Sequence, residues 1–385
     1  MRVLYWTDLY YPHIGGIETF SADLIPALQA RGHEVVLVTS MHDASAPHQE
    51  EIGGIPVYRF PSWEAIRTHD LRLLMTLRVN ISRLKQEFAP DVVHLHFGAT
   101  AYMHLQTRAA VDPPTLTTVH AIPASSLVAN SLFHKVALAS AAVNAVSARG
   151  ERILADAFPE LANRFSHVYY GLAAPEQKVS DIRTPSFEEP MILCLGRLAP
   201  QKGFDVALKA FAQAGPRIPR ARLRIVGEGV EEEALRQLAA DLGISDRVDF
   251  SGSVPPEAVF EVLNEASMIL MPSRFEGLPL VALQAAFMQR PIISSDVDGL
   301  PELVIDGESG RVLKENDPVE LAEAMIAMAQ DPERAIAMGK AAGRQFDANF
   351  RFDRCVSRYE ALYRSVAGNV TDADIPQSGA SIERS

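Results

Sequence analysis

The sequence has few cysteines and no long apolar run. Only two cysteines occur among 385 residues, Cys194 and Cys355, which is too few for a disulfide framework or a thiolate metal cluster. Both stand in apolar patterns that predict a buried strand and a helix, so we expect a reducing compartment. No stretch of 18 apolar residues occurs, and the first residues lead into a strand pattern instead of a secretion signal. We therefore expect a cytoplasmic protein.

The sequence also lacks an excess of positive charge. Its formal net charge of -12 argues against nonspecific binding to nucleic acid, which needs a basic surface. The charge is uneven, because residues 1–185 carry 15 Lys and Arg against 17 Asp and Glu, and the remainder carries 21 against 31. At 48% hydrophobic and 22% charged residues, the composition is that of a folded chain, and its length favours two domains. We expect those domains to have different partners.

Short β-rich runs alternate with helical patterns along most of the chain. RVLYWTD, EVVLVTS, DVVHLH and HVYYG are examples in the first half, and MILCLG, RLRIVG and SMILMPS in the second. Near-continuous apolar strands separated by helices predict doubly wound α/β domains with parallel sheets. We predict an N-terminal domain at 1–172, a linker at 173–190, a C-terminal domain at 191–350, a helix at 351–368 that packs back toward the N-terminal domain, and a flexible tail at 369–385.

Glycines follow the first predicted strand. In an open parallel sheet the ligand lies at the carboxyl ends of the strands, so the loops after strands are where candidate residues belong. Gly15 and Gly16 precede a helix that we expect to begin near Glu18, and a helix N-terminus offers free N–H groups to a phosphate. A turn that needs a positive φ would explain the same two glycines, so both interpretations stay open.

Two cations follow a buried strand of the second domain. Arg197 and Lys202 lie in one loop after MILCLG. An arginine offers a planar fork of donors and a lysine a movable point charge, which together suit a diphosphate. Two solvated surface cations are the alternative.

A glutamate stands in the loop after SMILMPS. Glu276 precedes Pro279, which suits a first helical turn, and Gln284 lies eight residues after Glu276, about two turns along one helix face. A carboxylate there can orient sugar hydroxyls, and the N–H groups near Gly277 and Leu278 can hold a phosphate. A plain helix cap is the alternative.

Seven motifs occur in a familiar order: GGIE, HLH, TVHA, GRLAPQKGFD, IVGEG, FEGLPLVALQA and GLPELVIDGESG. The chain resembles the retaining family 4 glycosyltransferases of the GT-B fold over about residues 1–365. The resemblance implies two Rossmann-like domains facing each other across a cleft. It also implies transfer, with retention, of a sugar from a nucleotide-diphospho-sugar bound by the second domain to a glycolipid or other glycan acceptor bound mostly by the first.

The resemblance assigns roles to the first group of candidate residues. Gly15 and Gly16 match the glycine loop near the donor phosphates, and His120 in TVHA matches the histidine beside the transferred sugar. Arg197 and Lys202 match the pyrophosphate clamp. We therefore expect His120, Arg197 and Lys202 to be catalytic.

The paired-glutamate motif of the family is altered here. Glu276 matches its first glutamate, which orients the sugar and is expected to be catalytic. Gln284 replaces the second, which usually holds the ribose, although an amide can still accept from one hydroxyl and donate to the other. With Gly15, Gly16, Gly277 and Leu278, Gln284 completes the expected donor-binding set.

We expect no cofactor and no metal. No acidic triplet is evident beside the two cations, and the cations supply the charge that magnesium would otherwise bring. Two rivals to transfer remain: a nucleotide-sugar epimerase or phosphorylase on the same scaffold, and a non-catalytic nucleotide-sugar-binding protein, which the change at Gln284 favours.

Two further patterns point to other ligands, and we reject both. His94 and His96 share one strand face, as metal ligands do, but no third ligand accompanies them. Gly227 and Gly229 follow a strand, but Glu232 stands where a dinucleotide fingerprint needs its third glycine.

The segment from Arg67 to Lys85 predicts a basic amphipathic helix. Arg67, Arg72, Arg78, Arg83 and Lys85 stand against Asp70 alone, among regularly spaced apolar residues. Such a helix can lie on an anionic membrane surface, which would make the protein peripheral on the inner face. Packing of its apolar face on the sheet, with solvated arginines, is the alternative.

Overall fold

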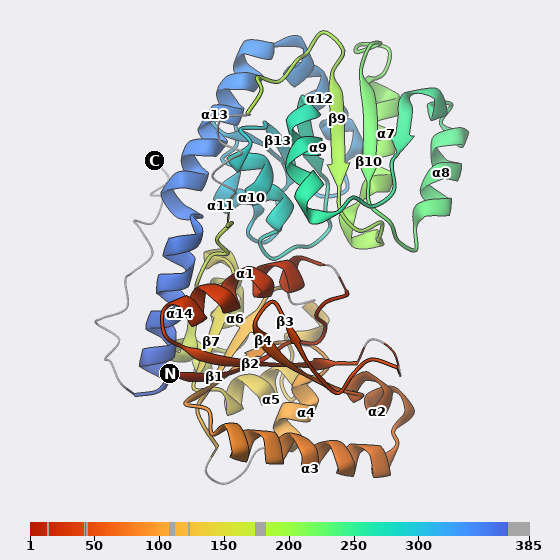
Figure 1. Ribbon diagram of the computed structural model, residues 1–385. Helices are drawn as coiled ribbons and strands as arrows, with labels where there is room; N and C mark the ends of the chain where they lie inside the picture. Colours follow the sequence, from red (N-terminus) through yellow and green to blue (C-terminus); the bar gives the residue numbers. More distant parts are fainter. Residues whose placement is uncertain are drawn as a thin grey trace. The chain divides into compact units, whose positions relative to one another are not determined.

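The computed structural model describes residues 1–13, 15–41, 43, 45–107, 112–121, 124–173 and 182–368. The described residues form two compact units, one from Met1–Tyr170 together with residues 353–368, the other from Gly171–Phe352. Each unit is a sheet with helices on both faces (Figure 1). The expected linker at 173–190 lies partly outside the described residues, and the expected tail at 369–385 lies wholly outside them.

The first unit is built on an eight-stranded sheet in the order β3-β4-β2-β1-β5-β6-β7-β8. All of its neighbouring strands are parallel except β3 and β4, an antiparallel edge pair that the polar run QEEI did not predict. The last strand ends at His167, so HVYYG contributes only its first residue. The strands are β1 (Arg2–Trp6), β2 (Glu34–Ser40), β3 (Gln49–Ile52), β4 (Ile55–Phe60), β5 (Val92–His96), β6 (Thr115–Val119), β7 (Ala142–Ala145) and β8 (Phe165–His167).

The two faces of this sheet carry different helices. Leu4 and Trp6 face an apolar layer from α2, α3 and α4, whereas Tyr5 and His94 on the other face hydrogen-bond α1 and α14. The helix predicted from Arg67 to Lys85 is broken near its start, because His69 adopts a positive φ and Asp70 caps α3 by accepting from two backbone N–H groups. The helices are α1 (Gly16–Ala30), α2 (Ser62–Thr68), α3 (Leu71–Phe88), α4 (Ala101–Gln106), α5 (Leu132–Ala139), α6 (Ala148–Ala157) and α14 (Phe352–Val366).

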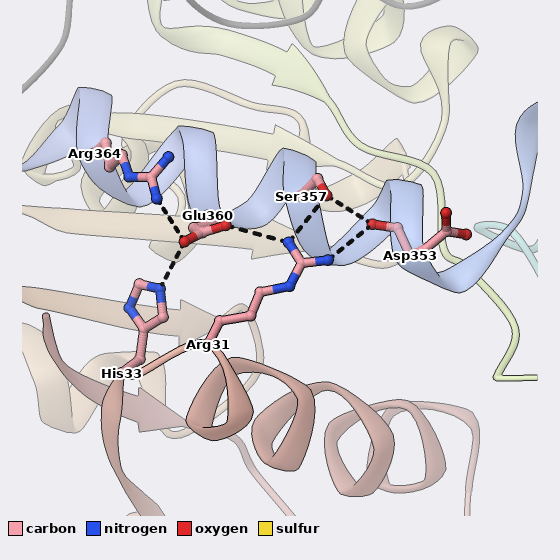
Figure 2. A network of polar contacts seen from close by, with 6 residues as sticks. All are labelled: Arg31, His33, Asp353, Ser357, Glu360 and Arg364. Carbon is pink, nitrogen blue, oxygen red and sulfur yellow. Dashed lines mark hydrogen bonds and ion pairs between the residues drawn. The ribbon is translucent and has the colours of Figure 1, made fainter.

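A polar network fastens α14 to the end of α1 (Figure 2). Arg31 donates to Ser357 at 2.9 Å and to Glu360 at 3.2 Å, while His33 and Arg364 contact Glu360 at 3.3 and 2.6 Å. Burial raises the pKa of Glu360, but the hydrogen bonds from His33 and Arg31 and the charge of Arg364 outweigh it and lower the pKa overall. The last described helix is thus part of the first unit.

The second unit has a six-stranded, wholly parallel sheet in the order β11-β10-β9-β12-β13-β14. This is the Rossmann order, in which the chain reverses direction across the sheet between its first and fourth strands, here β9 and β12. The strands are β9 (Met191–Leu195), β10 (Arg222–Val226), β11 (Val248–Phe250), β12 (Met268–Met271), β13 (Ile292–Ser295) and β14 (Gly310–Leu313). The helices are α7 (Phe204–Ala214), α8 (Glu232–Asp241), α9 (Val259–Glu265), α10 (Leu280–Phe287), α11 (Leu300–Leu303), α12 (Pro318–Gln330) and α13 (Pro332–Asn349).

Candidate active site

The switch point of the second sheet brings together two predicted residues. The Lys202 ammonium lies 2.6 Å from Oε1 of Glu276, although 74 positions separate them in the sequence. Ser273 donates to the same oxygen at 2.8 Å. The Lys202 side chain is 18% exposed and that of Glu276 only 6%, so this ion pair is largely shielded from water.

The loops that carry this pair are tied along their backbones. Arg274 donates its N–H to the Gln201 carbonyl at 2.8 Å, and the Gln201 amide donates to the Phe275 carbonyl at 3.1 Å. Gly203 has a φ of 65°, and a Cβ there would lie 2.0 Å from the Pro272 carbonyl oxygen. Glycine is therefore required where the two loops approach.

Arg197 lies in the same loop but is exposed. Within the described part of the chain, its guanidinium makes no hydrogen bond or ion pair, so all five N–H donors are available to a ligand. The neighbouring GEG motif packs on this loop: Leu198 donates to the Glu228 carbonyl at 2.9 Å, and a Cβ on Gly227 would lie 1.9 Å from the Gly196 oxygen. Close packing of two loops thus explains these glycines without a dinucleotide.

Helix α10 begins at Leu280, which corrects the expected geometry of the altered motif. Glu276 lies in the loop before this helix, so it does not share a helix face with Gln284. Gly277 and Leu278 lie between Glu276 and the N-cap residue Pro279, and no side chain caps the helix. The Gln284 side chain is half-buried and makes no hydrogen bond to the described residues.

The predicted glycines of the first unit follow β1. Gly15 is the N-cap of α1, which begins at Gly16 and not near Glu18. Gly15 has a φ of -158°, so the alternative of a positive-φ turn is wrong. A Cβ on Gly15 would lie 2.4 Å from Oε2 of Glu18, and Glu18 is only 7% exposed. The absence of a side chain makes room for that buried carboxylate.

His120 follows β6, and both of its ring nitrogens have partners. Nε2 lies 2.7 Å from Nδ1 of His96, and Nδ1 hydrogen-bonds the Tyr170 hydroxyl. The His96 and His120 rings stack with centroids 4.9 Å apart. Burial lowers the pKa of His120 to about 3, so the ring is neutral near pH 7.

His94 belongs to the same buried polar layer. Its ring nitrogens contact the Tyr363 hydroxyl at 2.7 Å and Thr118 at 2.8 Å, and its ring centroid lies 4.4 Å from that of His96. Burial lowers the pKa of His94 to about 3 and that of His96 well below its usual value. Across the described ranges, no three His, Cys, Asp or Glu side chains form a group that could hold a metal ion.

The apolar residues of α3, in the basic segment Arg67–Lys85, lie on two sides of the helix. Leu77, Ile81, Leu84 and Phe88 are buried against the sheet, whereas Leu71, Met75 and Val79 are 75%, 64% and 56% exposed. Lys85 differs from the arginines of this segment, because it is buried and lies 3.5 Å from Asp112. Arg67, Arg72, Arg78 and Arg83 are exposed as expected.

Several residues of these clusters were missed by sequence reasoning. Ser273 and Asp298, which hold Glu276, and Tyr170, which holds His120, carry no spacing signal toward their partners. Their position in loops after strands was the only available indication.

Two family profiles match the chain in succession. The profile described as Glycosyltransferase Family 4 matches residues 14–172, and that described as Glycosyl transferases group 1 matches residues 177–345. Together they span most of the sequence.

Similar proteins support the same assignment. The GDP-mannose-dependent alpha-(1-6)-phosphatidylinositol monomannoside mannosyltransferase of Mycobacterium tuberculosis is 28% identical over 387 residues, 94% of this chain and 98% of that one. The protein of the same description from Mycolicibacterium smegmatis is 35% identical over 166 residues, 41% of this chain and 43% of that one.

A solved structure establishes the fold. Sucrose-phosphate synthase from Thermosynechococcus elongatus has a TM-score of 0.82 over 96% of this chain and 100% of that one, at 21% identity. The expectation of two α/β domains with parallel sheets is thereby confirmed. None of the helices in the described ranges combines the length and the apolar character that crossing a bilayer requires. The chain belongs to the family 4 glycosyltransferases, and it is a glycosyltransferase with the GT-B fold.

Proposed function

We propose that the enzyme transfers a sugar from a nucleotide-diphospho-sugar, with retention and without a metal ion, to a lipid-linked or other glycan acceptor. The observation that carries this proposal is the Lys202–Glu276 pair at the switch point of the second sheet, with the exposed Arg197 in the same loop. Ligands of such sheets bind in the crevice at this point.

The proposed chemistry follows from charge. As the bond between the sugar and the diphosphate breaks, negative charge grows on the diphosphate and positive charge on the anomeric carbon. Arg197, Lys202 and the N–H groups of Gly277 and Leu278 stabilise the diphosphate, and preorganised donors of this kind contribute about 3 kcal/mol each. The leaving phosphate then takes the acceptor's proton on the face from which it departs, which retains the configuration.

Glu276 is suited to orient the sugar. Both of its side-chain hydrogen bonds within the described residues fall on Oε1, from Lys202 and Ser273. Oε2 is therefore left to accept from a sugar hydroxyl. Because the pair is largely buried, the carboxylate keeps one orientation before the donor arrives.

The first unit contributes His120, Gly15 and Gly16 to this proposal. His120 acts as a neutral ring, because its low pKa excludes a general acid near pH 7. Its ring nitrogens already contact His96 and Tyr170, so a hydrogen bond to a sugar hydroxyl replaces one of these contacts. Gly15 and Gly16 stand at the N-terminus of α1, whose backbone N–H groups suit the donor phosphates.

The nature of the acceptor is supported by a relative's name. The Mycobacterium tuberculosis protein is named for GDP-mannose as donor and a phosphatidylinositol mannoside as acceptor. We therefore place a lipid-linked glycan first among acceptors. Thermal-shift measurements with GDP, UDP and ADP identify the base, since a ligand at 100 times its Kd stabilises the fold by about 2.7 kcal/mol.

The function is tested by nucleotide release. With the sugar nucleotide of the base so identified, we expect nucleoside diphosphate to be released only when a glycan or glycolipid acceptor is present, and at an unchanged rate in excess EDTA. Release without any acceptor, or conversion of the donor to an isomer, would contradict transfer. Loss of activity in EDTA that magnesium or manganese restores would contradict the metal-free clamp.

Gln284 provides a test of donor binding. Glutamine can accept one hydroxyl proton and donate to the other hydroxyl, without the charge assistance of the glutamate that the family usually has. Neutral hydrogen bonds contribute about 0.5 to 1.5 kcal/mol and those to a charged group about 1.5 to 3, so the deficit is about 1 kcal/mol. Gln284→Glu is expected to bind nucleoside diphosphate about fivefold more tightly, with little change in kcat.

Calorimetric titration of nucleoside diphosphate into both proteins measures this effect. The new carboxylate of Gln284→Glu would weaken binding if the half-buried site opposes a charge. Equal or weaker binding by the variant would contradict the ribose contact proposed for position 284.

We also propose that α3 lies on an anionic membrane surface. Leu71, Met75 and Val79 are spaced four residues apart and form one outward apolar stripe, and helical periodicity places Arg72 and Arg78 along its borders. Packing on the sheet explains the buried stripe of α3 but not this second one. An interfacial helix combines such a stripe with flanking arginines.

The membrane proposal predicts salt-sensitive sedimentation with vesicles. The protein is expected to sediment with phosphatidylglycerol vesicles, less so as salt rises, and poorly with phosphatidylcholine vesicles. At about 1 kcal/mol per basic residue near the surface, replacing Arg72, Arg78 and Arg83 by glutamine is expected to lower the partition coefficient about a hundredfold.

The matched control is Val319→Ser, because Val319 is 60% exposed on α12 of the other unit. This control is expected to bind as the unmodified protein does, whereas Met75→Ser is expected to bind less. Equal binding to both kinds of vesicle, or none to either, would leave α3 as a packed helix only.

A further inference from the structure

The loop after β13 holds the peptide of Glu276. Oδ2 of Asp298 accepts a hydrogen bond from the Glu276 N–H at 2.5 Å. The next residue, Gly299, donates its N–H to the Gly277 carbonyl at 2.9 Å. The backbone on both sides of the Glu276 Cα is thus held by one neighbouring loop.

Asp298 holds this position in an unfavourable backbone conformation. Its φ is 43°, in the left-handed region where a side chain costs free energy and glycine does not. Asparagine and aspartate tolerate this region better than other residues. Asp298 is also half-buried, where a charged group costs more free energy than it does in water. A glycine at position 298 would remove the cost of the positive φ, so the presence of aspartate points to a role for its carboxylate.

The contact between Asp298 and the Glu276 backbone affects the position of the Glu276 carboxylate, the group proposed to bind the sugar. Glu276 has its Oε1 fixed by Lys202 and Ser273, and these bonds last only while its backbone stays in place. Asp298 touches the backbone of Glu276, not its carboxylate. Loss of Asp298 therefore changes the orientation of the Glu276 carboxylate but leaves its charge in place.

We propose that Asp298 is a positioning residue for Glu276, one that keeps the free Oε2 directed at the donor sugar. The proposal rests on the function proposed above for Glu276. A positioning role differs from a purely structural one in its effect on binding. Loss of Asp298 weakens binding of the donor sugar and leaves binding of the nucleoside diphosphate unchanged.

The test compares Asp298→Gly with Asp298→Asn. Glycine relieves the positive φ but removes the acceptor, whereas asparagine keeps an acceptor oxygen and tolerates the conformation. The measured quantity is the ratio of two Kd values, that of the nucleoside diphosphate over that of its sugar nucleotide, with the base chosen by thermal shift. Asp298→Gly is expected to lower this ratio about fivefold or more, and Asp298→Asn to preserve it.

Asn316→Gly is the matched control. Asn316 also has a positive φ, 57°, in the same unit, and among the described residues its side chain hydrogen-bonds only Glu315. This variant is expected to keep both Kd values. An unchanged ratio in Asp298→Gly, or equal weakening of both ligands, would overturn the proposal.

Glu276→Gln separates the two levels of inference. If Glu276→Gln leaves the ratio of the two Kd values unchanged, Glu276 does not bind the sugar. The proposed function of Glu276 then fails together with this inference. If Glu276→Gln lowers the ratio while Asp298→Gly does not, only the role of Asp298 fails.

Discussion

Replacing Lys202 by alanine is expected to lower kcat by about a hundredfold or more, because the ammonium faces negative charge that develops on the departing diphosphate. The same change is expected to destabilise the fold. Glu276 is nearly buried, and removal of its 2.6 Å partner leaves an unpaired charge at a cost of about 3 to 5 kcal/mol. Turnover and urea unfolding measured on one preparation report the two effects separately.

Arg197→Ala is the matched variant for this experiment. Its guanidinium is exposed and makes no hydrogen bond or ion pair among the described residues, so the free energy of unfolding is expected to stay unchanged while kcat falls by a similar factor. If the double variant Arg197→Ala with Lys202→Ala kept near-normal turnover, the two cations would not form a diphosphate clamp.

Acid is expected to unfold the first unit at an unusually high pH. Burial holds the pKa of His94 and of His120 near 3 and that of His96 well below its usual value, whereas in the unfolded chain each titrates near 6.5. The three histidines therefore bind protons in the unfolded state but stay neutral in the native state, and the free energy of unfolding falls as pH drops below about 6.5. At pH 5 the loss is about 2 kcal/mol for each of His94 and His120, and His96 adds to it in the same direction.

Asp23 acts in the opposite direction in the same range. Burial raises its pKa to about 6, so its protonation relieves a cost to the folded state as pH falls from 6 toward 4. The protonation of Asp23 offsets about 1 kcal/mol of this loss at pH 5, which leaves a net loss of about 3 kcal/mol from His94, His120 and Asp23, to which His96 adds. Urea unfolding at pH 7 and at pH 5 measures the difference.

Non-titrating replacements check the source of this pH dependence. His96→Gln is expected to have a smaller change in unfolding free energy between pH 7 and pH 5 than the unmodified protein, whatever its stability at pH 7. His48→Gln, at an exposed histidine of the same unit, is expected to keep the full slope. Stability that does not change between pH 7 and pH 5 would show that the three rings are protonated in the folded protein.

The sequence predicted the location of the site better than its internal contacts. Arg197, Lys202 and Glu276 were found because each lies in a loop after an apolar strand, and such loops meet at one edge of a parallel sheet. The ion pair between Lys202 and Glu276 could not be predicted, since the strand order that brings the loops after β9 and β12 together is a property of the whole sheet.

Errors arose where tertiary contacts override local pattern. The charge of Lys85 favours an exposed position, but Asp112 and the Thr107 carbonyl allow it to be buried. The histidines of VVHLH showed only that they share a strand face, not that tyrosines would cover them. The acceptor role of Asp298 depends on a φ that no spacing in the sequence indicates.

Helix α14 makes the first unit the last to be completed during synthesis. Tyr359 and Tyr363 of this helix are fully buried, and Tyr363 supplies a hydroxyl to His94. The ribosome makes the whole second unit between β8 and α14, which takes roughly 10 to 40 s at about 5 to 20 residues per second. During that time His94 of the nascent chain lacks its contacts with Tyr359 and Tyr363, so the second unit has time to fold before α14 completes the first.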